Sequence, residues 1–351
     1  MAPFTQLPTE LVALIVSFCD TPEIAALAAV DKEHHAIANP ILYDLRRSDE
    51  VDIAMLWACM TGRLGTLKRL VEYGGYVDDI CTNRCGASST LWGCDDDLPQ
   101  CLIDLLDLAP LALAAKYGQE EVVKWLIDHN AKIDRPAMNF CSCQASPDRY
   151  FAGHRSRRSV AWTPLHLAIC NNNVPIAKLL ISRGADPLHI ANPPHRAQSA
   201  LHTAAYRNII PMIDFLVTQK LVSIDHQDFL GLTPLHLSVL NYHNITALER
   251  LVELGANLEL RCKRGYGKTA LGFACLTGNF RAALFLLDKG ANPHICLRHD
   301  ISPLTVAGFT FNSLGTEPEP VDWTEWEGLR QKFKQRLIEL GVSEDAEEVE
   351  S

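Results

Sequence analysis

A glycine-containing string is the first candidate for chemistry. Residues 265–269 read Gly-Tyr-Gly-Lys-Thr, which is close to a loop that cradles phosphate with backbone amides and a lysine. Such a loop needs a further glycine five positions before its Gly-Lys pair, and Cys262 stands there. Nucleotide binding is therefore not expected.

Cysteines are the second candidate. Half of the twelve lie in two short stretches: Cys81, Cys85, Cys94, Cys101, Cys141 and Cys143. Thiolates are good zinc ligands, but these spacings are not those of a standard zinc site. A zinc site, a disulfide and ordinary reduced thiols all remain open, and reduced thiols are favoured. We expect no metal and no other cofactor.

Three histidines recur at a nearly constant interval and are the third candidate. His166, His202 and His236 are 36 and 34 residues apart. Each stands at the same place in a recurring string, so the histidines belong to a structural repeat and not to one site. No catalytic constellation remains, and the sequence predicts that the chain is not an enzyme.

The elements that position these histidines form a repeating unit. Its box is Thr-Pro-Leu-His-Leu-Ala at 163–168, and the central leucine recurs at 201, 235, 271 and 304. Two further copies centre on Leu56 and Leu111, with longer spacings that imply insertions at about 79–106 and 135–160. Thr caps a first helix and Pro starts it, whereas the second helix has an apolar stripe and ends at Gly or Asn. Because such a pair buries its apolar face only by stacking, we expect an all-α solenoid of about seven repeats over 52–342.

The unit length and the Thr-Pro-Leu-His-x-Ala box resemble the ankyrin repeat. In that family the box histidine forms hydrogen bonds between adjacent repeats, so the resemblance implies a structural role for the three histidines. The last repeat begins at Ser302, is interrupted at 315–320, and resumes with a more polar terminal helix at 326–340. Residues 343–351 contain five acidic residues and no aromatic one, which predicts a disordered acidic tail.

Residues 1–48 contain no such box and predict three short helices, at about 8–18, 22–29 and 31–44. The opening Leu7-Pro8-x-Glu10-Leu11 string and the apolar positions after it resemble an F-box. An F-box before ankyrin repeats is similar to a group of filamentous-fungal proteins. The resemblance implies docking on a Skp-type linker of a cullin–RING ubiquitin ligase through Leu7, Pro8, Leu11, Ile15 and Ile24. Alternatively, these helices only cap the solenoid.

A stack of repeats presents a long concave surface made of hairpin tips and the inner faces of the first helices. The residues expected there are Lys116, Tyr117, Asn171, Tyr206, Arg207, Phe229, Leu230, Asn241, Tyr266, Arg298 and His299. Tyr and Arg are enriched at interface hot spots, although any of these side chains could instead pack on its neighbours. The sequence predicts an adaptor that binds an unidentified protein substrate for ubiquitination, or an ankyrin scaffold with no ligase role.

Net charge and hydropathy argue against several other classes of protein. The net charge is −10, from 32 basic and 42 acidic residues, which argues against a general nucleic-acid binder. No apolar run approaches the roughly 20 residues of a membrane-spanning helix. Residues 1–4 do not begin a secretory signal, so we expect a cytoplasmic and/or nuclear protein.

Overall fold

The computed structural model describes residues 55, 58–72, 77–78, 109–138, 161–188, 191–192, 198–242, 244–263, 268–295, 302–304 and 323–342. The F-box-like residues 1–48, the expected tail and nearly all of both insertions lie outside the described residues. Internal contacts divide the chain into two units, Met1–Lys132 and Ile133–Ser351.

The first unit contains α5 (Leu64–Glu72), α6 (Pro110–Lys116) and α7 (Glu120–Asp128). Helices α6 and α7 pack on each other as one repeat. Two contacts connect this repeat to the preceding segment: Gln119 Nε2 donates to the Met60 carbonyl at 2.8 Å, and the Lys132 amide donates to the Asp78 carboxylate at 2.9 Å.

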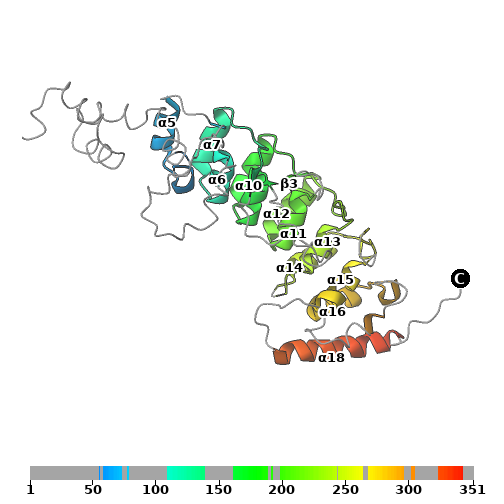
Figure 1. Cartoon of the computed structure of the whole chain (residues 1–351). Helices are drawn as coiled ribbons and strands as arrows, with labels where there is room; N and C mark the ends of the chain where they lie inside the picture. Colours follow the sequence, from blue (N-terminus) through cyan, green and yellow to red (C-terminus); the bar gives the residue numbers. More distant parts are fainter. Residues whose placement is uncertain are drawn as a thin grey trace, which may run out of the picture. The chain divides into compact units, whose positions relative to one another are not determined.

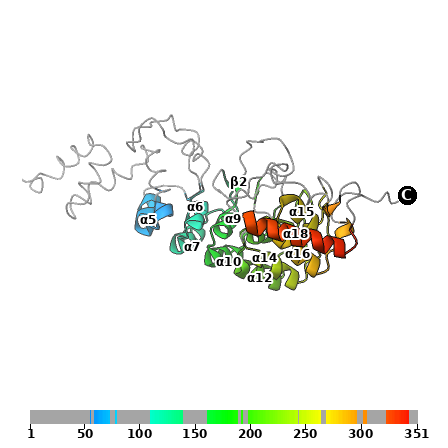
Figure 2. The same ribbon diagram turned by 90° about the horizontal axis from the view of Figure 1, so that it is seen from below.

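The second unit is a stack of helix pairs (Figures 1 and 2). The pairs are α9 (Pro164–Cys170) with α10 (Val174–Ser182), α11 (Ala200–Tyr206) with α12 (Ile210–Thr218), α13 (Pro234–Ser238) with α14 (Thr246–Glu253), and α15 (Ala270–Thr277) with α16 (Phe280–Asp288). First helices contact one another in order, α9 to α11 to α13 to α15, and α12 contacts α14. After a 3₁₀ turn, η4 (Pro293–Ile295), the long helix α18 (Trp323–Glu339) packs on α16. This arrangement is the mostly helical ankyrin fold that the sequence predicts.

First helices form because their ends are capped and their sides are buried. The Thr163 hydroxyl accepts a hydrogen bond from the His166 amide at 3.4 Å, and Pro164 occupies the first turn, where no amide is needed. All seven residues of α9 are buried. A seven-residue helix is unstable alone, so its stability comes from the helices packed around it.

Second helices bury one face and end at a residue with left-handed backbone. In α10 the buried residues are Ile176, Ala177 and Leu180, whereas Lys178 is exposed. The residue after each helix cap has φ between 55° and 101°, namely Asn130, Gly184, Lys220, Gly255 and Gly290. Gly and Asn adopt this conformation most readily, so the expected Gly or Asn end is confirmed at every position except Lys220.

A small sheet corrects the all-α expectation. Strands β1 (Ala137–Met138), β2 (Ala161–Trp162) and β3 (Ala191–Asn192) pair antiparallel in the order β1-β2-β3. Residues before a helix-starting proline are confined to extended backbone, and Thr163 has φ −70° and ψ 160°. The extended segment that leads into α9 therefore pairs with extended segments before and after it.

The recurring histidines connect neighbouring repeats. His166 Nδ1 lies 3.0 Å from Thr203 Oγ1 of the next repeat. His202 Nε2 lies 3.0 Å from the Leu232 carbonyl, and His236 Nε2 lies 3.1 Å from the Lys268 carbonyl. The geometry confirms the structural role that the ankyrin resemblance implies.

Burial keeps these imidazoles neutral. It lowers the pKa of His166 and of His202 to about 3 and that of His236 to about 4, and Arg207 lowers the pKa of His166 further. His236 Nδ1 accepts the Thr233 amide at 3.1 Å, so the ring proton is on Nε2 and is donated to the Lys268 carbonyl.

Acidification should therefore destabilise the second unit before carboxylates titrate. Unfolded histidines have a pKa near 6.5 and bind protons that the folded ones exclude, so the stabilisation is complete above pH 6.5 and is lost as pH falls toward 3–4. Between pH 7.5 and 5.5 the three residues should lower the free energy of unfolding by about 4 kcal/mol. Urea titrations followed by circular dichroism measure this.

The control variant is His236→Gln, which keeps an amide for hydrogen bonding but does not titrate. It should reduce the pH dependence by about one third, since one of three equivalent groups is removed. An unfolding free energy that is the same at pH 7.5 and 5.5 would contradict the assignment of neutral buried histidines.

Candidate protein-binding surface

Eight of the eleven residues predicted for the binding surface lie in the described part of the chain. Lys116 and Tyr117 belong to the first unit, and the second contains Asn171, Tyr206, Arg207, Phe229, Leu230 and Asn241. Tyr266, Arg298, His299, the five predicted linker-binding residues and the six insertion cysteines lie outside it.

At the end of α6, Lys116 Nζ lies 5.4 Å from the centroid of the Tyr117 ring, and Tyr117 is 44% exposed. A cation over an aromatic face holds the ring in place while one side stays open to solvent. Tyr117 is therefore an ordered, exposed aromatic side chain at the end of a first helix.

At the ends of α9 and α11, two predicted residues donate hydrogen bonds to carbonyls at the end of α9, one within its own helix and one across repeats. Asn171 Nδ2 donates to the Leu167 carbonyl at 2.8 Å, and Arg207 Nε donates to the Cys170 carbonyl at 2.9 Å. Both residues are exposed, whereas Tyr206 and Asn241 are half-buried. Arg207 thus connects two repeats and still presents surface to solvent.

Other side chains at these corners form similar connections, which the sequence does not predict. Tyr242 Oη donates to the Thr277 carbonyl at 2.8 Å, and Asn279 Nδ2 donates to the Val239 carbonyl at 2.7 Å. Trp326 Nε1 donates to the Gly278 carbonyl at 3.0 Å. Carbonyls near the C-terminal end of a helix have no N–H donor within that helix. These side chains provide the missing donors. Their types differ from repeat to repeat, so no sequence pattern marks them.

The hairpin tip at 226–232 is held by a dense set of hydrogen bonds. Asp228 is buried, and its Oδ1 accepts the amides of Leu230 at 2.9 Å and Leu232 at 2.8 Å. The Lys263 amide of the next tip donates to the Leu230 carbonyl at 2.7 Å. Gln227 Nε2 reaches the Gly231 carbonyl at 3.1 Å and so closes the same turn. On this tip Phe229 is 48% exposed.

Carboxylates at the tips accept backbone amides of the next repeat. The Asn257 amide donates to Asp225 at 2.9 Å, and the Asn292 amide donates to Glu259 at 2.8 Å. The Asp186 amide likewise donates to Asp134, whose pKa burial raises. These acids are half-buried, whereas Arg261 and Lys263 are exposed.

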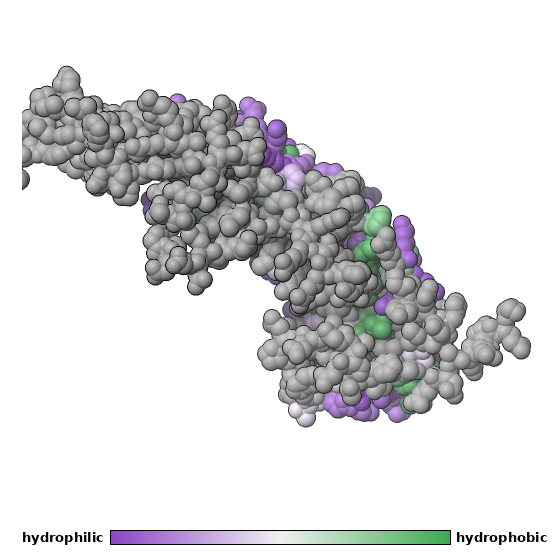
Figure 3. Space-filling view, viewed as in Figure 1, coloured by the Kyte–Doolittle hydropathy of each residue, from purple (hydrophilic) through white to green (hydrophobic). Residues whose placement is uncertain are grey.

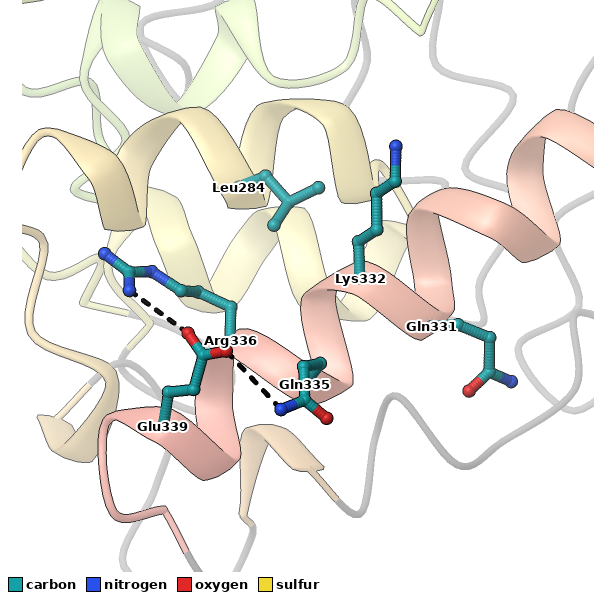
Figure 4. Close-up of a pocket in the computed structure, with 6 residues that line it drawn as sticks. All are labelled: Leu284, Gln331, Lys332, Gln335, Arg336 and Glu339. Carbon is teal, nitrogen blue, oxygen red and sulfur yellow. Dashed lines mark hydrogen bonds and ion pairs between the residues drawn. The ribbon is translucent and has the colours of Figure 1, made fainter.

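A shallow, solvent-open depression lies between α16 and α18 (Figure 4). It is lined by Leu284, Gln331, Lys332, Gln335, Arg336 and Glu339. Arg336 forms ion pairs with Glu339 at 3.3 Å and with Asp288 at 3.8 Å. A solvent-open hollow with a single apolar side chain does not have the character of a small-molecule site.

The described residues contain no group of three or more His, Cys, Asp or Glu side chains placed to hold a metal. Cys59, Cys170, Cys262 and Cys275 are buried, and burial raises the pKa of Cys59 to about 12 and also raises that of Cys262. Cys59, Cys170 and Cys275 are thus small residues of the core. Of the helices that the structure describes, none combines the length and the apolar character needed to cross a membrane.

Comparison with known proteins identifies the family. The family described as "Ankyrin repeats (3 copies)" matches residues 100–228 and 201–296, so the chain belongs to the ankyrin-repeat family. Proteins of this family are protein-interaction modules, which agrees with the surface of helix ends and tips.

Several curated proteins share this array. The chain is 28% identical over 157 residues to neurogenic locus notch homolog protein 1 of Xenopus tropicalis, a match that covers 44% of this chain and 6% of that protein. It is 28% identical over 137 residues to the B-cell lymphoma 3 protein homolog of Mus musculus, covering 37% and 29%. It is 24% identical over 236 residues to ankyrin repeat and SAM domain-containing protein 6 of Danio rerio, covering 67% and 28%. The matched region spans less than a third of each of these relatives.

Among solved structures, the human ASB11 ankyrin repeat domain is similar, with a TM-score of 0.52 and 21% sequence identity. The match covers 80% of this chain and 96% of that one. At this identity the similarity establishes the fold.

The tip geometry predicts that Gly231→Ala destabilises the second unit more than a matched glycine substitution does. Gly231 has φ +77°, and an added Cβ would lie 2.6 Å from the Lys263 amide nitrogen. Strained backbone and the forced shift of the neighbouring tip should together cost about 2–4 kcal/mol.

The matched variant is Gly184→Ala, because Gly184 has φ +101° and nothing within 4 Å of its Cβ position. It should cost only about 1 kcal/mol, from backbone strain alone. Urea unfolding of both variants measures the difference, and equal losses would contradict the close approach of the two tips.

Proposed function

We propose that this chain is a non-enzymatic adaptor of a cullin–RING ubiquitin ligase. In this proposal the ankyrin array binds a protein substrate, and residues 1–48 bind a Skp-type linker. Tethering a substrate near the ligase raises its effective concentration at the site of ubiquitin transfer, so the adaptor needs no chemistry of its own.

The observation that carries substrate binding is the ordered tip with Phe229 on it. Phe229 is 48% exposed, yet the backbone beneath it is fixed by Asp228 and by the amide of Lys263. An exposed aromatic on a rigid support loses little conformational entropy when a partner covers it. Large aromatic side chains of this kind dominate the energy of protein interfaces.

The linker-binding half of the proposal is supported by the Leu7-Pro8-x-Glu10-Leu11 string, by the apolar residues that follow it and by its place directly before the repeat array. Leu7, Pro8, Leu11, Ile15 and Ile24 are the side chains that would enter the linker interface.

A second candidate function is an ankyrin scaffold whose N-terminal helices only cap the array. One observation favours it: beyond the last regular helix pair that the structure describes, the long helix α18 covers α16. Phe333 and Leu337 of α18 are fully buried, and α18 packs on α16. A solenoid exposes apolar surface at both ends, so a capping module at the N-terminus is physically reasonable.

Linker binding separates these two functions. The full-length chain should co-purify with a Skp-type linker, and the double variant Leu7→Ala/Pro8→Ala should lose at least tenfold in affinity, since apolar anchors at an interface centre are the costly ones to truncate. Calorimetry with purified linker gives the affinities, and circular dichroism checks that the array stays folded.

The matched control is Thr5→Ala/Gln6→Ala, which changes two adjacent residues outside the predicted contact set. It should bind as the natural chain does. A folded natural chain that does not bind the linker would leave only the scaffold function.

A further inference from the structure

Two consecutive hairpin tips of the second unit form one continuous surface, here called the tip surface. It consists of Phe229 and Leu230 from the first tip and of Arg261 and Lys263 from the second. Phe229, Arg261 and Lys263 are exposed, and Leu230 is half-buried. In the space-filling view, apolar residues reach the surface beside hydrophilic ones in the part of the array around α13 and α15 (Figure 3).

Hydrogen bonds between the two tips fix this surface. The Lys263 amide donates to the Leu230 carbonyl at 2.7 Å, and Gln227 Nε2 contacts the Arg261 carbonyl at 3.3 Å. Gly231 lies so close to Lys263 that a Cβ would meet the Lys263 Cγ at 2.8 Å. The apolar part and the cationic part of the surface are therefore held in one arrangement before any partner binds.

Charge is distributed unevenly across these tips. Asp228 is buried within its own turn, and Asp225 and Glu259 accept backbone amides of the following repeat. The side chains of Arg261 and Lys263 extend from exposed positions. Although the whole chain has a net charge of −10, the solvent side of this surface presents apolar groups next to cations.

The described first helices of the second unit extend this pattern. Helices α9, α11, α13 and α15 contain no Asp or Glu, and Arg207 at the end of α11 is exposed. The acidic residues of the helix pairs lie instead on second helices, for example Asp214 on α12 and Glu253 on α14. A ligand on the first-helix side of the array therefore meets fewer acidic groups than one on the second-helix side.

We infer that the tip surface binds an acidic segment of a partner protein that contains a large apolar side chain. The apolar side chain packs on Phe229 and Leu230, and flanking carboxylates face Arg261 and Lys263. This inference rests on the proposed function, because it specifies the class of protein segment that the adaptor binds. Apolar burial supplies most of the affinity, and the charges determine orientation and exclude basic segments.

A peptide selection tests the inference directly. A displayed library of random 12-residue peptides is selected on the immobilised full-length chain, and enriched peptides are synthesised with a fluorophore for anisotropy. The expected consensus is one or two of Leu, Ile, Phe or Met flanked by at least two Asp or Glu residues. Raising NaCl from 50 to 300 mM should weaken binding several-fold, because exposed charge pairs are screened.

Two substitutions in the tip surface should reduce peptide affinity, one by removing apolar contact and the other by reversing a charge. Phe229→Ala should weaken binding by about tenfold or more at every salt concentration, because it removes the apolar anchor. Lys263→Glu should weaken binding by about tenfold at low salt and by clearly less at high salt, because its effect is electrostatic.

Matched controls change equivalent groups elsewhere. Ile338→Ala removes an apolar side chain that is 57% exposed on α18, and Lys178→Glu reverses an exposed charge on the second helix α10. Both should change affinity by less than about twofold, in line with surface positions outside a hot spot.

The outcomes separate this inference from the function on which it rests. The inference would be overturned if the enriched peptides were basic or neutral. It would also be overturned if acidic peptides bound the Phe229→Ala and Lys263→Glu variants with unchanged affinity. Either result would leave the array as a protein-binding surface of another specificity. Failure to enrich any peptide would count against both. Tighter binding of a labelled 12-nucleotide single-stranded DNA than of every peptide, abolished by Lys263→Glu, would assign the surface to nucleic acid and also overturn the inference.

Discussion

The burial of each first helix between its neighbours is the interaction on which the second unit depends. Helix α9 has only seven residues, all of them buried, and so has no stability of its own. Buried histidines then fix the register of the stack, because a neutral imidazole such as that of His236 accepts within its own helix cap and donates to the next repeat. One-dimensional stacking of this kind makes each repeat depend on the repeats beside it.

The helical units could be predicted from sequence because their determinants are local. The Thr-Pro-Leu-His box specifies a cap, a helix start and a buried leucine within a few residues, and Gly or Asn marks where the second helix ends. The ankyrin resemblance also implied the role of the histidines correctly. By contrast, the corner connections and the three-strand sheet depend on which repeats become neighbours. Arg207 illustrates the limit, because its exposure was predictable but its bond to the Cys170 carbonyl was not.

The last helix shows how the array departs from its repeat where stacking ends. The sequence predicted a polar terminal helix at 326–340, and α18 spans Trp323–Glu339, three residues earlier at its start. Trp326 and Phe333 pack against Phe280 with ring centroids 5.2 and 5.4 Å apart, so α18 covers apolar surface of α16 that another repeat would otherwise bury. Several of its exposed positions are polar, among them Gln331, Lys332 and Gln335, which is typical of a helix that caps a stack.

In the tip surface, the groups that fix the backbone of the two tips differ from the side chains that would contact a partner. The bonds that place the tips use backbone groups of Leu230, Leu232 and Lys263 together with the side chains of Asp228 and Gln227. The side chains that would touch a partner project from this fixed backbone and are not required to define its path. Changing Lys263 to another residue therefore alters the charge presented to a partner while the backbone bond to Leu230 stays in place. A stack built in this way can acquire new partners through its tips without disturbing the buried helices that hold it together.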